Sequence, residues 1–203
     1  MGLFNTGTGV GLPILMANGF SPFALPLHLV QLEYWLHGFS SHVIPFRLID
    51  NRDVNAYAQH VADAVNAQCD RHKSEKINLM GISLGAVAGL AAIKRLGIAH
   101  RVATFVAVGG PMLGSDMAWA GLPTGIFTRL GLQMLPASPF VCKLASEPLP
   151  TGPRYLAIAG SNDYICPVWT ALFPGAEGIV LKFHHFGTIG DPSIVRAVVP
   201  YLG

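Results

Sequence analysis

A serine between two glycines is the residue of this sequence best placed to do chemistry. Residues 81–85 read Gly-Ile-Ser-Leu-Gly, after the apolar run Ile77 to Met80 and before an apolar stretch rich in Gly and Ala. The run predicts a buried strand and the stretch a helix, so the serine would lie on a sharp turn with its hydroxyl clear of the backbone. Glycines on both sides let the strand and the helix approach closely. Between a predicted strand and a predicted helix, the pattern G-x-S-x-G predicts that Ser83 is a nucleophile. Without that context, an ordinary Gly-rich turn would explain the pattern.

The turn at Ser83 also offers a place for negative charge. A helix that begins at Leu84 leaves the backbone N–H of Leu84 free, and the positive end of the helix dipole lies at the same point. Such a donor stabilises the oxyanion that forms when a serine attacks a carbonyl group. The segment therefore predicts acyl chemistry, in which a histidine acts as the base and an acidic residue orients it.

The elements that must position these residues alternate regularly along the chain. Short apolar runs that end in Gly, Asn or Asp alternate with longer amphipathic stretches, which is typical of βα units and a parallel sheet. We expect an α/β fold with a mostly parallel sheet of about six strands flanked by helices. Strands are expected at residues 12–17, 43–49, 77–80, 102–108, 155–159 and 179–183, and helices at residues 22–38, 53–69, 84–96, 168–173 and 192–202.

With these residues in place, the chain from Leu12 to Leu202 resembles the α/β-hydrolase superfamily, particularly its compact lipases and esterases. In that family the first recognisable strand ends in His-Gly, and the next residue gives the second oxyanion-hole N–H. The corresponding residues here are Asn18, Gly19 and Phe20, so the resemblance implies the Phe20 N–H as a donor, although Asn18 replaces the usual histidine. Residues 108–115 are similar to a Gly-Thr-Pro-His-x-Gly family marker, with Gly and Met in place of Thr and His.

The resemblance also implies an acid and a histidine, in the chain order Ser, Asp, His. Residues 159–167 follow an expected strand and resemble the family loop in which an aspartate precedes a proline, which nominates Asp163. His184 and His185 both follow the last expected strand. The position before Phe186 and Gly187 favours His185 as the base, and His184 is the alternative.

Residues 111–153 interrupt the alternation, with many Pro and Gly and scattered large apolar residues. We interpret this segment as a short cap insertion in a single domain of residues 1–203. Its composition predicts an apolar acyl pocket or a surface that contacts lipid, while a lid packed on the core would use the same residue types. The substrate-binding residues nominated in this segment are Met112, Leu113, Trp119 and Phe127.

The composition excludes several classes of protein. The 203 residues are 51% hydrophobic and 12% charged, and a chain of this length can bury the core of one domain. A net charge of +2 without a Lys/Arg stripe excludes a nucleic-acid-binding protein. The three cysteines lack metal-ligand spacing and favour a reducing compartment, although a bridge between Cys142 and Cys166 stays open. No secretory signal is visible, so we expect a cytoplasmic protein, with secretion after signal removal as the alternative.

The sequence therefore predicts a carboxylic ester hydrolase that acts through an acyl-enzyme on apolar acyl esters. Ser83, His185 and Asp163 would form the catalytic triad, and the N–H groups of Phe20 and Leu84 the oxyanion hole. The reaction needs no metal and no organic cofactor. Two alternatives stay open: a thioesterase or acyltransferase with the same triad, and a catalytically silent protein of this fold that binds a lipid or a partner.

Overall fold

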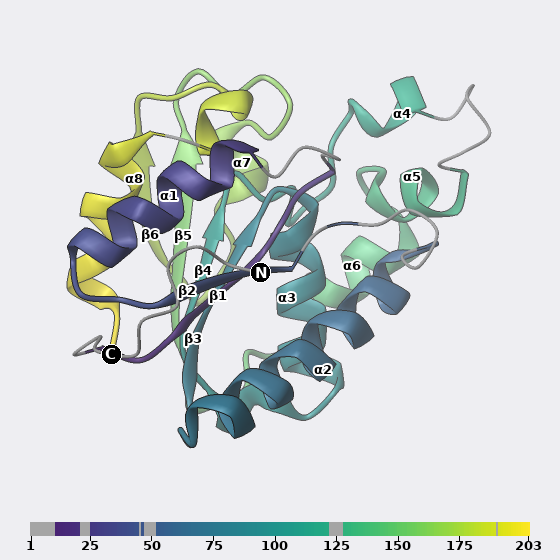
Figure 1. Ribbon diagram of the computed structural model, residues 1–203. Helices are drawn as coiled ribbons and strands as arrows, with labels where there is room; N and C mark the ends of the chain where they lie inside the picture. Colours follow the sequence, from purple (N-terminus) through teal and green to yellow (C-terminus); the bar gives the residue numbers. More distant parts are fainter. Residues whose placement is uncertain (1–10, 21–24, 45, 47–51, 122–127, 190) are drawn as a thin grey trace.

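The computed structural model describes residues 11–20, 25–44, 46, 52–121, 128–189 and 191–203, and these form a parallel sheet covered by helices on both faces (Figure 1). The sheet has six strands in the order β2-β1-β3-β4-β5-β6, and every neighbouring pair is parallel. This confirms the predicted α/β architecture. The strands are β1 (Ile14–Ala17), β2 (Ser41–Ile44), β3 (Ile77–Ile82), β4 (Val102–Val108), β5 (Arg154–Gly160) and β6 (Glu177–Leu181).

The helices follow the strands in the order that βα units require. Two of the helices begin at a capping aspartate. Asp53 accepts from the Ala56 N–H at the start of the helix Val54–His72, and Asp191 accepts from the Ser193 N–H at the start of the helix Pro192–Val198. The helices are α1 (Leu25–Leu36), α2 (Val54–His72), α3 (Leu84–Arg95), η1 (Ile98–Arg101), α4 (Ala118–Gly121), α5 (Thr128–Met134), α6 (Pro139–Ser146), α7 (Val168–Ala171), η3 (His185–Ile189), α8 (Pro192–Val198) and η4 (Val199–Tyr201).

Two apolar cores lie on the two faces of the sheet. Helices α1 and α8 cover one face, and α2, α3 and α6 cover the other (Figure 1). Because both faces are covered, β3 is buried along its whole length and β4 and β5 along nearly all of theirs, as the continuous apolar runs in their sequences predict.

The order of the strands places a switch point between β1 and β3. The chain runs from β1 outward to β2 on one side, then returns to β3 on the other side of β1 and continues outward to β6. Helices therefore leave the carboxyl ends of β1 and β3 in opposite directions, and ligands of open α/β sheets bind at such a point. Gly19 follows β1 here, and Ser83 follows β3.

The predicted elements differ from the observed ones mainly at their ends. The prediction for β6 runs to Phe183, but the strand ends at Leu181, and Phe183 turns inward as a buried core residue. The second strand begins two residues before its predicted start and ends at Ile44, with residues 45 and 47–49 of the prediction outside the described part of the chain. Residues 22–24 of the first predicted helix also lie outside it.

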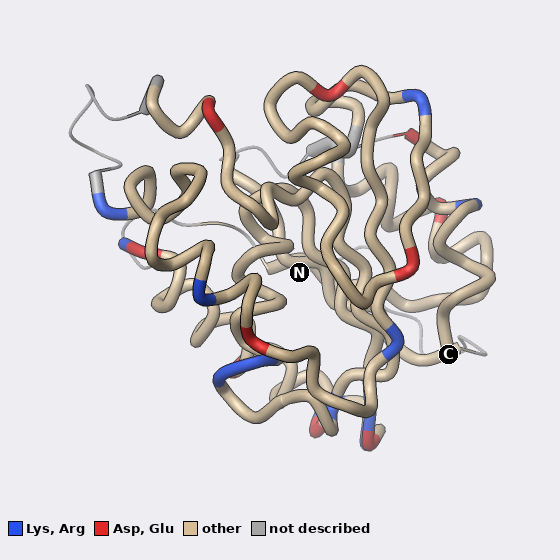
Figure 2. The backbone as a smooth tube through the Cα atoms, turned by 180° about the vertical axis from the view of Figure 1, so that it is seen from behind, with Lys and Arg blue, Asp and Glu red and all other residues tan. Residues whose placement is uncertain are grey.

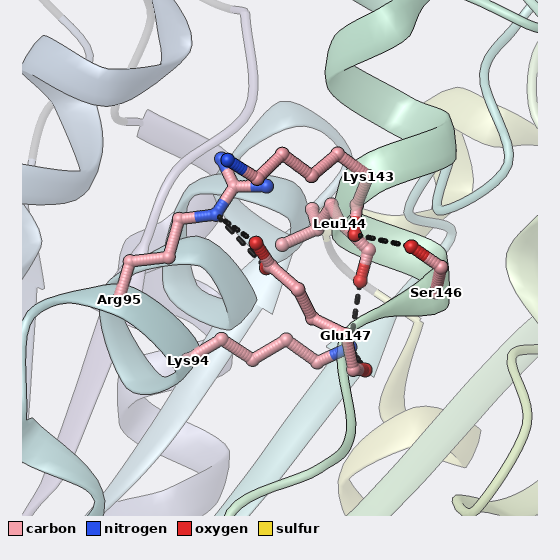
Figure 3. A network of polar contacts seen from close by, with 6 residues as sticks. All are labelled: Lys94, Arg95, Lys143, Leu144, Ser146 and Glu147. Carbon is pink, nitrogen blue, oxygen red and sulfur yellow. Dashed lines mark hydrogen bonds and ion pairs between the residues drawn. The ribbon is translucent and has the colours of Figure 1, made fainter.

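Helix α6 lies within the segment predicted as a cap, yet it belongs to the layer that covers the sheet. Its Val141 and Leu144 are buried in the core. The α3 residue Lys94 donates to the carbonyl oxygens of Leu144 and Glu147 at 2.7 and 2.6 Å, so it satisfies the carboxyl end of α6 (Figure 3). An ion pair of 2.9 Å between Arg95 Nε and Glu147 Oε2 holds the same two helices together.

Charged residues are scattered over the described part of the chain, with both signs mixed (Figure 2). Among the described helices, none is both long and apolar enough to cross a membrane. Cys69, Cys142 and Cys166 are all free thiols, and only Cys142 is exposed, so the bridge left open from the sequence is not formed.

Candidate active site

Ser83 lies on a strained turn between β3 and α3. Its backbone has φ 52° and ψ −122°, a conformation that a residue with a side chain rarely adopts and that is found at functional sites. The two flanking glycines are required by close contacts: a Cβ on Gly81 would lie 2.4 Å from the Ala86 Cα, and a Cβ on Gly85 would lie 2.1 Å from the Ala17 carbonyl oxygen. The turn therefore packs the start of α3 directly against β1 and β3.

Asp163 and His185 reach Ser83 from the connections that follow β5 and β6. The His185 Nε2 lies 3.0 Å from the Ser83 Oγ, and the His185 Nδ1 lies 2.8 Å from the Asp163 Oδ2. With Nδ1 protonated toward the carboxylate, Nε2 can accept the serine proton. The structure therefore brings together all three residues that the sequence nominated as nucleophile, base and acid. His184, the alternative base, is exposed.

The carboxylate of Asp163 is fixed by its own loop. Its side chain has 0% exposure, and its Oδ1 accepts hydrogen bonds from the backbone N–H groups of Ile165 and Cys166 at 2.9 and 2.8 Å. These bonds use one oxygen and leave Oδ2 for His185. A buried carboxylate needs such partners, because an unpaired charge would be costly there.

The segment nominated for the oxyanion hole lies next to the nucleophile. A Cβ on Gly19 would lie 2.9 Å from the Ser83 Cβ and 3.1 Å from the Ile82 carbonyl oxygen, so residue 19 must be a glycine for β1 to end this close to Ser83. Phe20 follows at once, with its side chain 49% exposed and its ring 5.2 Å from that of Phe46. Leu84 is the first residue of α3, where the backbone N–H groups have no acceptor within the helix.

The four residues nominated in the predicted cap have different positions. Met112 is 2% exposed and packs in the apolar core together with residues of α3. Leu113 is half-buried, and Trp119 on α4 is 60% exposed. Phe127 lies outside the described residues.

Sequence reasoning missed Tyr57 of α2. Its side chain is completely buried, and its hydroxyl donates to the Asn18 carbonyl oxygen at 2.7 Å, directly before the nominated oxyanion segment. Desolvation by burial raises the pKa of Tyr57, so the hydroxyl stays a donor. Its position on the apolar face of α2 predicts burial, but no local pattern connects it with residues 18–20.

A metal ion would compete with the hydrogen bonds already described. Among the described residues, Asp163, Cys166 and His185 form the group whose possible ligand atoms lie within 4.8 Å of one another. However, His185 and Asp163 hydrogen bond to each other there, and burial together with the nearby Asp163 raises the pKa of the Cys166 thiol. Because both Asp163 oxygens and the His185 Nδ1 already have hydrogen-bond partners in the protein, this group fits a hydrogen-bonded relay better than a metal site.

Known proteins resemble this chain in fold but not closely in sequence. No family model matches the sequence, and no curated protein matches it significantly. The mature form of the Bacillus licheniformis lipase BlEst2 is similar with a TM-score of 0.77 at 16% identity, over 96% of this chain and 92% of the lipase. For the propeptide form of that lipase the TM-score is 0.77 at 17% identity, and this chain spans 50% of its length.

Two further structures agree with this comparison. An α/β-hydrolase enzyme from a metagenome of lagoon sediments at Mar Chica, Morocco, has a TM-score of 0.68 at 18% identity, over 95% of this chain and 90% of that enzyme. A thermophilic esterase from Thermogutta terrifontis has a TM-score of 0.59 at 18% identity, over 95% and 89% of the two chains. The chain therefore has the α/β-hydrolase fold, as its resemblance to that superfamily implied.

Proposed function

We propose that this chain, with its α/β-hydrolase fold, is a serine hydrolase that cleaves carboxylic esters. The observation that carries the proposal is the hydrogen-bonded series from Ser83 through His185 to Asp163, which begins at a serine with φ 52°. A positioned nucleophile, base and orienting acid are the parts that acyl transfer to serine needs. The solved structures with the same fold include proteins named as lipases and esterases, which supports the proposal.

The reaction proceeds through an acyl-enzyme. The Ser83 Oγ attacks the ester carbonyl carbon while His185 Nε2 takes the serine proton, and Asp163 stabilises the resulting imidazolium. The tetrahedral intermediate then expels the alcohol, which receives that proton from His185. Water attacks the acyl-enzyme, again with His185 as the base, and the release of the carboxylic acid returns the proton to Ser83.

The negative charge on the carbonyl oxygen needs donors on the side of the site away from His185. The N–H of Leu84 at the start of α3 and the N–H of Phe20 beside Gly19 are the proposed donors. Each donor of this kind contributes roughly a hundredfold or more to the rate. The close approach of Gly19 to Ser83 supports this role, because it brings the residue 20 backbone near the carbonyl that Ser83 would attack.

The proposed substrate is an ester with an apolar acyl group, presented alone or at a lipid surface. Large apolar side chains follow directly after three residues of the site: Phe20 after Gly19, Tyr164 after Asp163 and Phe186 after His185. Their side chains are 49%, 88% and 75% exposed. Exposed apolar side chains that directly follow site residues in the chain favour an apolar ligand over a charged one.

Hydrolysis of p-nitrophenyl esters from acetyl to palmitoyl tests this proposal. Ser83→Ala removes the nucleophile, and Ser161→Ala, at an exposed serine outside the triad, is the matched control. We expect activity in the wild-type protein and in Ser161→Ala, and its loss in Ser83→Ala by at least about a thousandfold. Equal activity of Ser83→Ala and wild type would refute the nucleophile, and inactivity of all three proteins on every ester would refute ester hydrolysis. Transfer of the acyl group to an added alcohol would assign the same triad to an acyltransferase.

A further inference from the structure

The peptide that joins Asn18 to Gly19 is held at both of its ends. Its carbonyl oxygen accepts from the Tyr57 hydroxyl at 2.7 Å. Its N–H, which belongs to Gly19, donates to the Asn18 Oδ1 at 2.8 Å. The Gly19 N–H is therefore occupied, and Phe20 carries the next N–H along the chain. Only the backbone torsions of Gly19 separate the fixed peptide from that donor.

Those torsions matter because glycine is the residue with the widest conformational freedom. A glycine is required at position 19 by the contacts with Ser83 and Ile82, so the sequence cannot restrict this point with a side chain. Hydrogen bonds on the preceding peptide are therefore one means of fixing the direction of the Phe20 N–H. An oxyanion-hole donor is effective when its N–H already points at the position of the oxyanion before the negative charge develops.

We infer that Tyr57 is a positioning residue for the oxyanion hole, acting through the Asn18 carbonyl group. The inference rests on the proposed ester hydrolysis. The hydroxyl of Tyr57 fixes the peptide plane at the end of β1, and this plane sets where the Phe20 N–H points. The Asn18 side chain completes the arrangement by holding the Gly19 N–H.

Helix α2 provides a rigid base for Tyr57, which lies in its first turns. At its start, the Val54 N–H donates to Gln133 Oε1 at 2.8 Å, and Asp53 Oδ2 pairs with Arg129 Nε at 3.1 Å. Both partners come from α5, so the helix that follows the undescribed residues 122–127 anchors the end of α2 nearest to Tyr57.

The ring and the hydroxyl of Tyr57 do different things, which allows a clean test. The Tyr57 ring lies 5.3 Å from the Phe46 ring, which lies 5.2 Å from the Phe20 ring, and these contacts support packing. Tyr57→Phe keeps the ring and removes only the donor to Asn18. Tyr34→Phe is the matched control, because Tyr34 is equally buried and its hydroxyl donates to Met80 Sδ at 3.4 Å on the other face of the sheet.

The experiment compares wild type, Tyr57→Phe and Tyr34→Phe with p-nitrophenyl butyrate and with an alkyl trifluoromethyl ketone. The Ser83 Oγ adds to the carbonyl carbon of that ketone, and the carbonyl oxygen becomes an oxyanion. The inhibition constant therefore reports directly how well the oxyanion-hole donors stabilise that charge. For Tyr57→Phe we expect kcat to fall about tenfold, the inhibition constant to rise by about the same factor, and KM to stay within about twofold. Tyr34→Phe should match wild type in all three quantities.

A purely structural role predicts a different pattern. Tyr57→Phe with kcat and inhibition constant within about twofold of wild type would overturn the inference while leaving ester hydrolysis intact. The same loss in Tyr34→Phe would overturn it too, because the effect would then follow from the loss of any buried hydroxyl. A wild-type protein that neither hydrolyses the ester nor binds the ketone would overturn the proposed function, and the inference with it.

Discussion

Replacement of Asp163 separates the chemistry of the site from the stability of its loop. In Asp163→Asn the amide oxygen can keep the two bonds that Oδ1 accepts from the N–H groups of Ile165 and Cys166. The amide NH₂ then faces the His185 Nδ1 in place of the carboxylate Oδ2, which lies 2.8 Å from that nitrogen in the wild-type protein. An NH₂ donor favours the tautomer with the proton on Nε2, and that nitrogen can no longer accept the Ser83 proton.

The expected loss of activity is large. A wrong tautomer together with an unstabilised imidazolium lowers kcat by roughly ten thousandfold in a serine triad. This corresponds to about 5 kcal/mol of lost transition-state stabilisation. Because the amide has nearly the shape of the carboxylate and keeps both backbone bonds, the melting temperature should change by less than about 3 °C.

Asp163→Ala should behave differently, because it removes the acceptor of both backbone bonds. The N–H of Cys166 is buried and would lose its partner, while the N–H of Ile165 is partly buried and can reach water. Each unsatisfied buried donor costs about 1–3 kcal/mol, so we expect a total loss of about 3 kcal/mol in the free energy of unfolding. For a chain of this length that loss lowers the melting temperature by about 6–12 °C.

The assay is the hydrolysis of p-nitrophenyl butyrate together with thermal unfolding of wild type, Asp163→Asn and Asp163→Ala. Asp163→Asn with kcat within about tenfold of wild type would show that another residue orients His185. Asp163→Ala with the melting temperature of wild type would show that the two N–H bonds do not stabilise the loop. Either result would refute the reasoning from the geometry of the carboxylate.

Two further predictions follow from histidines. His185→Ala should lower kcat for p-nitrophenyl butyrate by roughly ten thousandfold, whereas His184→Ala, at an exposed position, should stay within about threefold of wild type; the reverse result would assign the base to His184. Burial lowers the pKa values of His42 and His72, whose Nε2 atoms are 3.2 Å apart, so below the ordinary value of 6.5 the folded state binds fewer protons than the unfolded one. The free energy of unfolding should therefore fall as the pH drops from 7 to 5, and urea unfolding of His42→Asn should show a smaller fall; an equal fall would exclude this histidine as a source.

Much of the fold could be read from the sequence because its signals are local. Each central strand is buried on both faces and therefore reads as a continuous apolar run, and the residues 102–108 predicted for β4 are those observed. The position of Ser83 is also a local matter, because one short segment contains the strand end, the turn and the helix start. Asp163 and His185 needed a further expectation, the chain order of a family that the sequence only resembled.

The remaining features depend on contacts between segments far apart in the chain. Adjacent histidines have the same local pattern, and only the path of η3 after Phe183 directs His185 toward Ser83 and leaves His184 exposed. Met112 lies in an apolar segment that would suit a pocket or a core equally, and its burial beneath α3 was decided by packing.

The sequence by itself determined which segments form strands, where the nucleophile lies and that the chain forms parallel βα units, because periodicity and turn residues act over a few neighbours. Only the tertiary structure decided which side chains share one site. Tyr57 is 39 residues from Asn18 in the chain, and their hydrogen bond exists because α2 packs beside the end of β1. Contacts of this kind depend on how whole elements pack, and no local pattern of residues records them.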